Sequence, residues 1–437
     1  MLNNKPNITV IDAPMGRGKS TAMIHHINEN PDENYVVVLP TRSECVRYAE
    51  ALERVTTVPH LDAVSSKESL LTIFNEAVFR GETIITTHAL LKLWDDTSIL
   101  ALRGKNYTLI LDEVLEVVHP FPITAKDYNA LKAGGIIKES QDELTGLTRV
   151  NLTDPEYQGK HDDFIRQVAR GNVVRVRDDF CVWLTGAQRL TAFDEVLVLT
   201  YNFQGSIMSA WLKLNNLTYN TKSLVNGEFV GYMPEFGFPF RELIDIVQDY
   251  ELNKIGGRHH SLSSSDLAKA PAEKLKRLRN NIRKFFKRND AKEPHYNMWT
   301  TPLKFKPKLQ CSPFGYIGGR VSPNQLRKMK AEERVQRDTH VAYNMKATNL
   351  YAHKKYLAYA YNVFPNPALT RLFNECNIPF DRDQYALNEL VQWLWRSRIR
   401  QGKDITVYIP AKRMRNLLID WLNTESPADL KTTQQAA

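Results

Sequence analysis

Long apolar runs are missing from the 437-residue sequence, and cysteine is scarce. No stretch approaches the roughly 18–20 apolar residues that a membrane helix requires, so we expect no membrane partner. The N-terminal residues turn glycine-rich after a short apolar run, unlike a signal peptide. The cysteines are scattered in a pattern that fits neither a disulfide framework nor a zinc site, which favours a cytoplasmic protein; they are Cys45, Cys181, Cys311 and Cys376.

An excess of acidic residues is also lacking. Lys plus Arg number 58 against 49 Asp plus Glu, which gives a net charge of +9. The apolar fraction of 43% is too high for a disordered chain, and the length predicts two or three domains. A basic protein of this kind suits nucleic acid or another acidic partner.

The first 120 residues alternate short β-rich runs with helical stretches. Continuous runs of Val, Ile and Leu are typical of a parallel sheet covered on both faces, and the alternation predicts an open, doubly wound α/β sheet. In such sheets ligands bind beyond the carboxyl ends of the strands. The expected strands span 7–12, 35–40, 82–87 and 107–112.

The segment 13–20, APMGRGKS, fits the phosphate-binding loop G-x-x-x-x-G-K-[ST], with Ala13 in place of the first glycine. Glycines let backbone N–H groups turn toward phosphate oxygens, the lysine reaches the β- and γ-phosphates, and the serine hydroxyl reaches Mg²⁺. We therefore expect ATP and Mg²⁺ as cofactors. The predicted nucleotide-binding residues are Gly16, Arg17, Gly18, Lys19, Ser20 and Thr21.

The strand expected at 107–112 ends in two adjacent acids, Asp112 and Glu113. Adjacent carboxylates repel, and a metal beside a triphosphate would compensate for that repulsion. Asp112 is the expected Mg²⁺ residue together with Ser20, and Glu113 is the expected base for the attacking water. A solvated strand end is the alternative. Glu116 is expected on a helix surface.

These segments together resemble motifs I, Ia, Ib and II of superfamily 2 helicases of the DEAD/DEAH-like type. The resemblance rests on APMGRGKS, LPTR (39–42), ITTHALL (85–91) and LDEV (111–114). It implies that Thr41, Arg42, Thr87 and His88 face a nucleic-acid strand. Helix capping by Thr41 and Thr87 is an equally good reading, and the two roles are compatible.

Motif III of that family has two candidates, 181–187 and 195–203, and we favour the second, with Thr200 as the coupling residue. The polar stretch at about 120–180 predicts an insertion in the first lobe, either a loop or a small subdomain.

In the second half, 295–306 is an expected strand that ends in Thr300 and Thr301, and its part WTTPLKF (299–305) resembles motif IV. The segment 344–351 resembles motif V, with Thr348. The resemblance implies that Thr300 and Thr348 contact nucleic acid. Residues 269–292 contain ten Lys or Arg and two acids, with apolar residues at helical spacing, so we expect a basic amphipathic helix within an insertion at about 255–295. Its charged side is either a solvated face or a surface that follows phosphates. The segment 256–265, GGRHHSLSSS, is expected to be a flexible connection, and its His259–His260 pair a loop rather than a metal site.

The segment 392–400, QWLWRSRIR, resembles motif VI, with Trp395 replacing a glycine. On one continuous helix Gln392, Arg396 and Arg400 would share a face. That face would act on the γ-phosphate from the other lobe. Arg398 is the alternative to Arg400 as the second arginine.

Taken with the resemblance, the sequence predicts two tandem RecA-like lobes, 1–215 and 216–425, and a disordered tail, 426–437. The likeness is strongest to phage-encoded replication helicases and implies an ATP-dependent DNA helicase or translocase in phage replication or recombination. Expected partners are single-stranded or forked DNA, with RNA left open, and replication or recombination proteins in the host cytoplasm. The alternatives are a phage DNA-packaging motor and an ATP-switched origin-binding protein.

Overall fold

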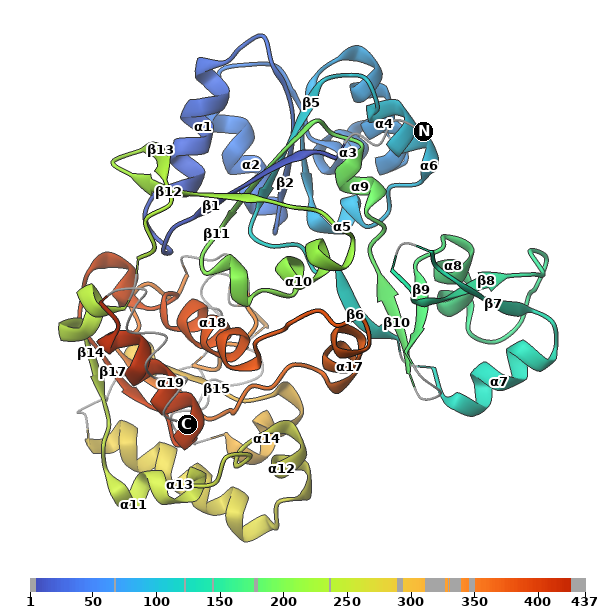
Figure 1. Cartoon of the computed structure of the whole chain (residues 1–437). Helices are drawn as coiled ribbons and strands as arrows, with labels where there is room; N and C mark the ends of the chain where they lie inside the picture. The colour runs from blue at the N-terminus through green and yellow to red at the C-terminus, as the bar shows by residue number, and fades with distance from the viewer. Residues whose placement is uncertain are drawn as a thin grey trace. The chain divides into compact units, whose positions relative to one another are not determined.

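The computed structural model describes residues 5–66, 68–121, 123–143, 145–176, 180–235, 237–288, 294–310, 327–328, 330, 339–345 and 350–425. The chain forms two compact units (Figure 1). Unit 1 comprises Met1–Met233 and Pro365–Asp381, and unit 2 comprises Pro234–Phe364 and Arg382–Ala437. Among the described residues, no helix combines the length and the hydropathy needed to cross a membrane.

Unit 1 is built on an eight-stranded sheet in the order β13-β12-β1-β11-β5-β2-β4-β3. All neighbours are parallel except β12 and β13. The four expected strands are all present in it, so the predicted parallel α/β sheet is confirmed. The strands are β1 (Asn7–Asp12), β2 (Asn34–Leu39), β3 (Thr56–Thr57), β4 (Thr83–Thr87), β5 (Tyr107–Asp112), β11 (Glu195–Thr200), β12 (Asn220–Val225) and β13 (Glu228–Gly231).

The central strands of this sheet, β1, β2, β4, β5 and β11, are buried on both faces. Along β2, Val36 and Val38 belong to one apolar cluster, whereas Tyr35, Val37 and Leu39 belong to another. This alternation explains why the strands read as continuous apolar runs. The surrounding helices are α1 (Lys19–Glu29), α2 (Arg42–Ala51), α3 (Pro59–Ser66), α4 (Leu70–Arg80), α5 (His88–Leu91), α6 (Asp96–Leu102), α9 (Gln188–Thr191), η1 (Phe203–Gly205) and α10 (Ile207–Leu214).

The segment between β5 and β11 forms a separate antiparallel sheet in the order β6-β10-β9-β8-β7. It has its own apolar core, which includes Tyr128, Val150 and Phe164. The expected insertion is therefore a small subdomain rather than a loop. Its elements are β6 (Val118–Phe121), α7 (Ala125–Ala133), β7 (Ile137–Gln141), β8 (Thr148–Leu152), α8 (Asp162–Ala169), β9 (Val173–Val176) and β10 (Phe180–Leu184).

One helix from late in the sequence belongs to unit 1. α17 (Pro367–Glu375) buries Leu369, Leu372 and Phe373 in the same cluster as Val182 and Leu184 of β10. Unit 1 also continues through β12, which pairs with β1. The structural division therefore differs from the expected boundary at 215/216, because β12, β13 and α17 complete unit 1.

Unit 2 contains a parallel sheet in the order β14-β17-β16-β15. Its strands are β14 (Ile244–Ile246), β15 (Asn297–Thr300), β16 (Tyr356–Tyr359) and β17 (Ile405–Tyr408). Its helices are η2 (Phe238–Leu243), α11 (Tyr250–Asn253), η3 (Lys254–Gly256), α12 (Ser264–Lys269), α13 (Ala272–Arg288), η4 (Pro294–Tyr296), η5 (Leu303–Phe305), α14 (Lys306–Leu309), α18 (Arg382–Leu394), η6 (Arg398–Gln401) and α19 (Lys412–Asn423).

The expected basic amphipathic helix is confirmed as α13. Its apolar side chains are buried, and its basic residues lie on the exposed side. Arg288 at its end pairs with Asp249, and Lys274 near its start pairs with Asp266 at 2.7 Å. The charged face is thus available to solvent along most of the helix, with ion pairs near its two ends.

Candidate nucleotide site

The loop between β1 and α1 has the backbone that its glycines predict. Gly16 and Gly18 both have a φ of +83°, a left-handed conformation that residues with a Cβ rarely adopt. Gly18 is the N-cap of the eleven-residue helix α1, and its carbonyl accepts from the N–H of Ala22 at 2.8 Å. Gly16, Arg17, Gly18 and Thr21 are exposed. Free N–H groups at a helix N-terminus favour an anion at this position.

Lys19 lies across this loop. Its Nζ donates to the carbonyl of Ala13 and, at 3.0 Å, to that of Pro14. Backbone carbonyls here hold the ammonium group beside the loop that would receive the phosphates. A lysine held in this way is a point charge ready for phosphate oxygens.

Ser20 and Asp112 come together as the motif spacing predicts. Ser20 Oγ donates to Asp112 Oδ2 at 2.8 Å, and the Tyr48 hydroxyl donates to the same oxygen at 3.3 Å. Burial raises the pKa of Asp112 to about 6; the charge of Glu113 adds to this effect, while the Ser20 hydrogen bond and Lys19 oppose it. A hydroxyl and a carboxylate are ligands that Mg²⁺ accepts, so the pair fits this ion.

Glu113 follows Asp112 with a φ of +70°, which is uncommon for a residue with a long side chain. Its N–H donates to the carbonyl of Leu199 at 2.9 Å, which fixes this turn to the neighbouring strand β11. The side chain is half-buried beside the strand end. Strained backbone of this kind concentrates at functional sites, and the role of Glu113 as a base stays a prediction.

Asp12 is a residue that the sequence reasoning missed. Its carboxylate accepts from the backbone N–H of Asn202 at 2.7 Å and of Phe203 at 3.0 Å. Burial raises the pKa of Asp12, and the two backbone N–H donors oppose that rise. The N–H of Ala13 also donates to the carbonyl of Thr200 at 3.0 Å. Asp12 therefore ties the start of the phosphate loop to the end of β11. An acid directly before the loop was the available signal.

The two candidate strands for motif III fall into different sheets. β11 lies between β1 and β5 in the main sheet, whereas β10 lies in the inserted sheet. Thr200 is therefore at the end of a strand next to the phosphate loop, and its side chain is buried. This placement agrees with the preference for 195–203. Coupling by Thr200 stays a prediction.

The residues expected to face nucleic acid divide into exposed and buried ones. Thr41 Oγ1 caps α2 by accepting from the N–H of Glu44 at 3.3 Å, and Arg42 is exposed beside it. Thr87 caps α5 and also contacts His60 Nε2 at 2.9 Å, with its side chain buried. His88 is buried, and its Nε2 lies 3.0 Å from the carbonyl oxygen of Asp112.

Thr87 and His88 are therefore buried rather than exposed to a nucleic-acid strand, and their side chains form hydrogen bonds at the ends of β4 and β5. In unit 2 the same correction applies to Thr300, whose side chain has no exposed surface at the end of β15. Thr348 lies outside the described residues.

The expected single helix through motif VI is wrong. α18 ends at Leu394, because Ser397 Oγ donates to the Leu394 carbonyl at 2.6 Å and the chain turns there. Gln392 is in α18, Arg396 is in the turn, and Arg400 is in η6, so the three do not share a helical face.

The three arginines of this segment differ in environment. Arg396 is buried, with 8% of its surface exposed. Arg398 pairs with Asp404, and Arg400 is exposed. Trp395, in the place of the family's glycine, is buried against Phe240 and Trp421, with ring centroids 4.8 and 5.7 Å apart. The segment is therefore held by packing of its tryptophan.

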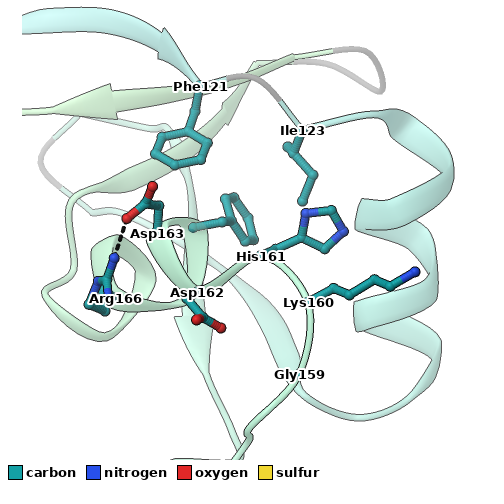
Figure 2. Close-up of a pocket in the computed structure, with 9 residues that line it drawn as sticks. Phe121, Ile123, Gly159, Lys160, His161, Asp162, Asp163 and Arg166 are labelled. Atoms are coloured by element: carbon teal, nitrogen blue, oxygen red, sulfur yellow. Dashed lines mark hydrogen bonds and ion pairs between the residues drawn. The ribbon is translucent and has the colours of Figure 1, made fainter.

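A separate pocket of about 480 Å³ lies in the inserted subdomain of unit 1 (Figure 2). Phe121, Ile123, His161 and Phe164 are among the residues that line it, and Arg166 pairs with Asp163 at its edge. None of the predicted nucleotide or nucleic-acid residues lines this pocket.

The fold and this site define a two-lobe α/β protein of the RecA-like type, built around a phosphate-loop sequence. Solved structures with a similar fold include two of XPD. One, described as XPD helicase, matches with a TM-score of 0.53 and 10% identity over 99% of this chain and 96% of that one. An XPD structure described as apo matches with a TM-score of 0.51 and 11% identity over 97% and 96% of the two chains.

Residues 239–422 match the family described as the YonV C-terminal Rossmann-like domain. The chain is also 30% identical over 430 residues to the SPbeta prophage-derived uncharacterized protein YonV of Bacillus subtilis (strain 168), which covers 96% of this chain and 99% of that protein. The chain therefore belongs to the YonV family.

Proposed function

We propose that this protein is an ATP-dependent helicase or translocase of superfamily 2 that moves along single-stranded nucleic acid. The observation that carries the proposal is the hydrogen bond between Ser20 and Asp112 beside the phosphate loop. It brings together the hydroxyl and the carboxylate that an Mg-nucleotide requires. The two-lobe fold shared with XPD helicases supports the proposal.

The nucleotide would lie on the loop 13–20. Lys19 supplies a positive charge to the phosphates, and the N–H groups at the start of α1 supply further donors. Ser20 and Asp112 would hold Mg²⁺, which when bound offsets the negative charge of the phosphates. Glu113 orients the attacking water and accepts its proton.

The arginines that would act on the γ-phosphate belong to unit 2. Arg398 forms an ion pair with Asp404. We therefore assign Arg396 and Arg400 as the arginine fingers, the arginines that would contact the γ-phosphate. An arginine supplied from another lobe stabilises charge that develops in the transition state. Gln392, half-buried at the end of α18, would position the γ-phosphate or its water.

Nucleic acid would be gripped by Thr41 and Arg42 in unit 1 and by the basic face of α13 in unit 2. Asp12 links the end of β1 to Asn202 and Phe203, which follow β11. Through this link, a change at the γ-phosphate would alter how tightly the protein holds the nucleic acid. Thr200, whose carbonyl accepts from Ala13, lies on that route. Alternate tight and loose grip would then give directed movement.

A packaging motor would need a metal-dependent nuclease in addition to the ATP site. Among the described residues no group of three or more His, Cys, Asp or Glu could hold a metal ion. Asp383, one of the acids in the second half, pairs with Arg413 at 2.6 Å. These observations favour the helicase over the packaging motor.

The prophage origin of the YonV relative suggests the setting. We place the protein in the cytoplasm of a host cell, in phage DNA replication or recombination, with single-stranded or forked DNA as the substrate. RNA and partner proteins of those pathways are further candidates for contact.

Steady-state ATP hydrolysis, measured with and without a single-stranded oligonucleotide, tests the proposal. We expect Mg²⁺-dependent turnover that the oligonucleotide stimulates. An ATP hydrolysis rate that the oligonucleotide does not change would favour an ATP-switched binding protein. A metal-dependent nuclease activity would favour a packaging motor.

A further inference from the structure

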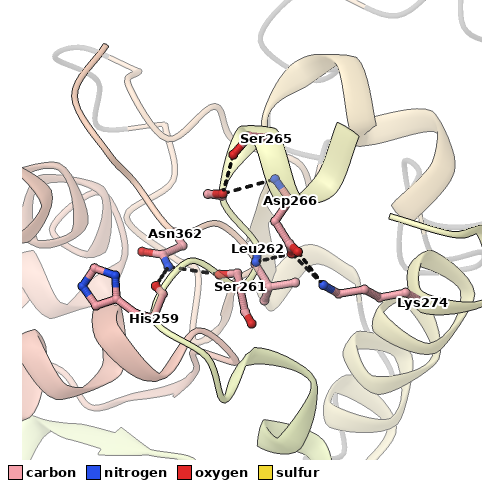
Figure 3. Close-up of polar contacts among 8 residues, drawn as sticks. His259, Ser261, Leu262, Ser265, Asp266, Lys274 and Asn362 are labelled. Carbon is pink, nitrogen blue, oxygen red and sulfur yellow. Dashed lines mark hydrogen bonds and ion pairs between the residues drawn. The ribbon is translucent and has the colours of Figure 1, made fainter. Parts of the chain in front are cut away.

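Residues 257–263 of unit 2, within the connection expected at 256–265, have a defined backbone (Figure 3). They form two successive turns, in which the N–H of Ser261 donates to the Arg258 carbonyl at 3.0 Å and the N–H of Ser263 donates to the His260 carbonyl at 3.2 Å. The segment joins η3 to α12. Backbone hydrogen bonds thus give this segment a defined conformation, although it is part of a glycine- and serine-rich stretch.

Asn362, just beyond β16, anchors this segment. Its Nδ2 donates to the carbonyls of His259 at 2.8 Å and Ser261 at 3.0 Å, and its own N–H donates to the Leu262 carbonyl at 3.0 Å. Arg413 completes the anchor by donating to Asn362 Oδ1 at 3.0 Å. The segment is therefore fixed to the carboxyl end of a central strand, as Figure 3 shows for Asn362 and His259.

The backbone is strained at the next residue. Leu262 has a φ of +65° although it is a leucine, and its side chain has no exposed surface. Its N–H donates to Asp266 Oδ2 at 2.7 Å, and Asp266 is in turn paired with Lys274. A left-handed leucine is unfavourable and persists only where its surroundings hold it. Such strain is typical of loops that present side chains for binding.

The side chains presented are basic and aromatic. Arg258, His259 and His260 are exposed, and Phe364 is half-buried next to them. The rings of His259 and His260 lie 4.5 Å apart, and those of His260 and Phe364 lie 5.2 Å apart. The guanidinium of Arg413 lies 4.2 Å from the Phe364 ring centroid. Three rings in mutual contact thus form a small aromatic surface.

This surface lies at the carboxyl ends of the strands of unit 2, where open α/β sheets bind their ligands. The arginines at 396–400 precede β17 and therefore belong to its amino end. Aromatic rings beside an arginine match what single-stranded nucleic acid requires, which is stacking for the bases and charge for the phosphates.

We propose that His259, His260 and Phe364 form a stacking platform for the bases of single-stranded nucleic acid, with Arg258 meeting its phosphates. The inference rests on the proposed function and adds a base-contacting element outside the helicase-like motifs. The platform reads no particular sequence, because every base has a face that can stack.

The test is binding of fluorescein-labelled dT20 to the full chain by fluorescence anisotropy. His259→Ala with His260→Ala removes two rings and should weaken binding on the order of tenfold, within the range known for base–aromatic stacking. His259→Phe with His260→Phe should restore most of the affinity. Phe79→Ala is the matched control, since Phe79 is 80% exposed in unit 1 and has Lys105 Nζ 5.5 Å from its ring centroid.

The outcomes distinguish failure of the stacking platform from failure of the proposed function. If the alanine pair binds dT20 as the wild type does, or if the phenylalanine pair binds as weakly as the alanine pair, the platform is refuted while the motor remains. If the wild type itself does not bind dT20, the proposed function fails first. An abasic 20-mer should bind the wild type and the alanine pair equally. ATP hydrolysis without DNA should stay at the wild-type rate in the alanine pair, which shows that the ATP site is intact.

Discussion

The ionisation of Asp112 should control nucleotide binding between pH 4 and 7. This carboxyl is buried beside Glu113, and its pKa is raised to about 6. An Mg²⁺ ligand must be deprotonated. In the free protein at pH 5 only about one molecule in eleven would carry the ionised form, so Mg²⁺-dependent affinity should fall about tenfold from its plateau above pH 7.

The stability of the free protein should change with the opposite sign. A folded pKa above the unfolded value means that the folded state binds more protons between about pH 4 and pH 6. The free energy of unfolding should therefore decrease as the pH rises through that interval. Asp112→Asn removes the titrating group and should flatten this part of the profile.

Titration of a fluorescent ATP analogue with and without Mg²⁺, from pH 4.5 to 8, measures the binding effect. The nucleotide has its own titration, so Asp112→Asn is the control and the difference between the two profiles is the informative quantity. Loop contacts through Lys19 persist in the variant, which keeps weak binding measurable. A wild-type profile that runs parallel to that of Asp112→Asn would refute the assignment of Asp112 as the Mg²⁺ residue.

Four further groups of variants test the other parts of the site. Lys19→Ala should weaken nucleotide binding in an equilibrium titration, whereas Glu113→Gln should keep binding and lose turnover; wild-type hydrolysis by Glu113→Gln would show that another group is the base. Arg396→Ala and Arg400→Ala should each keep ATP affinity within a few-fold of the wild type and lower the turnover rate, since the loss of an arginine finger lowers such rates by a factor on the order of 10³–10⁵. Arg398→Ala should keep nearly the wild-type turnover rate, because this side chain pairs with Asp404. A loss of turnover in Arg398→Ala, with wild-type turnover in the other two variants, would show that Arg396 and Arg400 are not the fingers. Replacing Arg279, Arg283, Lys284 and Lys287 by Ser should make oligonucleotide binding less dependent on salt, because the logarithm of the binding constant falls with the logarithm of the salt concentration by about 0.7 per neutralised phosphate. Arg288→Ser is the control, because Arg288 pairs with Asp249. An unchanged slope in the fourfold variant would show that the basic side of α13 is a solvated face. Asp12→Asn should reduce stimulation of turnover by DNA more than basal turnover, since it weakens two hydrogen bonds to Asn202 and Phe203; equal loss of both would indicate a purely structural role.

The local parts of the site could be predicted from the sequence. The phosphate loop is one continuous segment, and its glycines have the left-handed backbone that the motif requires. Ser20 and Asp112 meet because parallel strands bring their carboxyl ends to one edge of a sheet, which the apolar runs already indicated. Motif spacing and strand topology were sufficient here.

The parts that depend on distant partners could not be predicted. The donors to Asp12 lie at Asn202 and Phe203, and nothing near Asp12 points to them. Gln392, Arg396 and Arg400 have helical spacing, but a hydrogen bond from Ser397 and the burial of Trp395 end the helix earlier. The assignment of α17 to unit 1 depends on apolar contacts with an inserted sheet whose strands are hidden among polar turn residues.

Strand displacement is the most direct test of the central claim that ATP turnover drives movement on a single strand. Duplexes with a 3′ tail, with a 5′ tail and with blunt ends should be compared in Mg-ATP for the wild type and for Glu113→Gln. We expect the wild type to displace the strand of one tailed duplex and to leave the blunt duplex intact, and we expect Glu113→Gln to displace no strand. If the wild type hydrolyses ATP but displaces no strand from either tailed duplex, the proposed helicase activity is wrong.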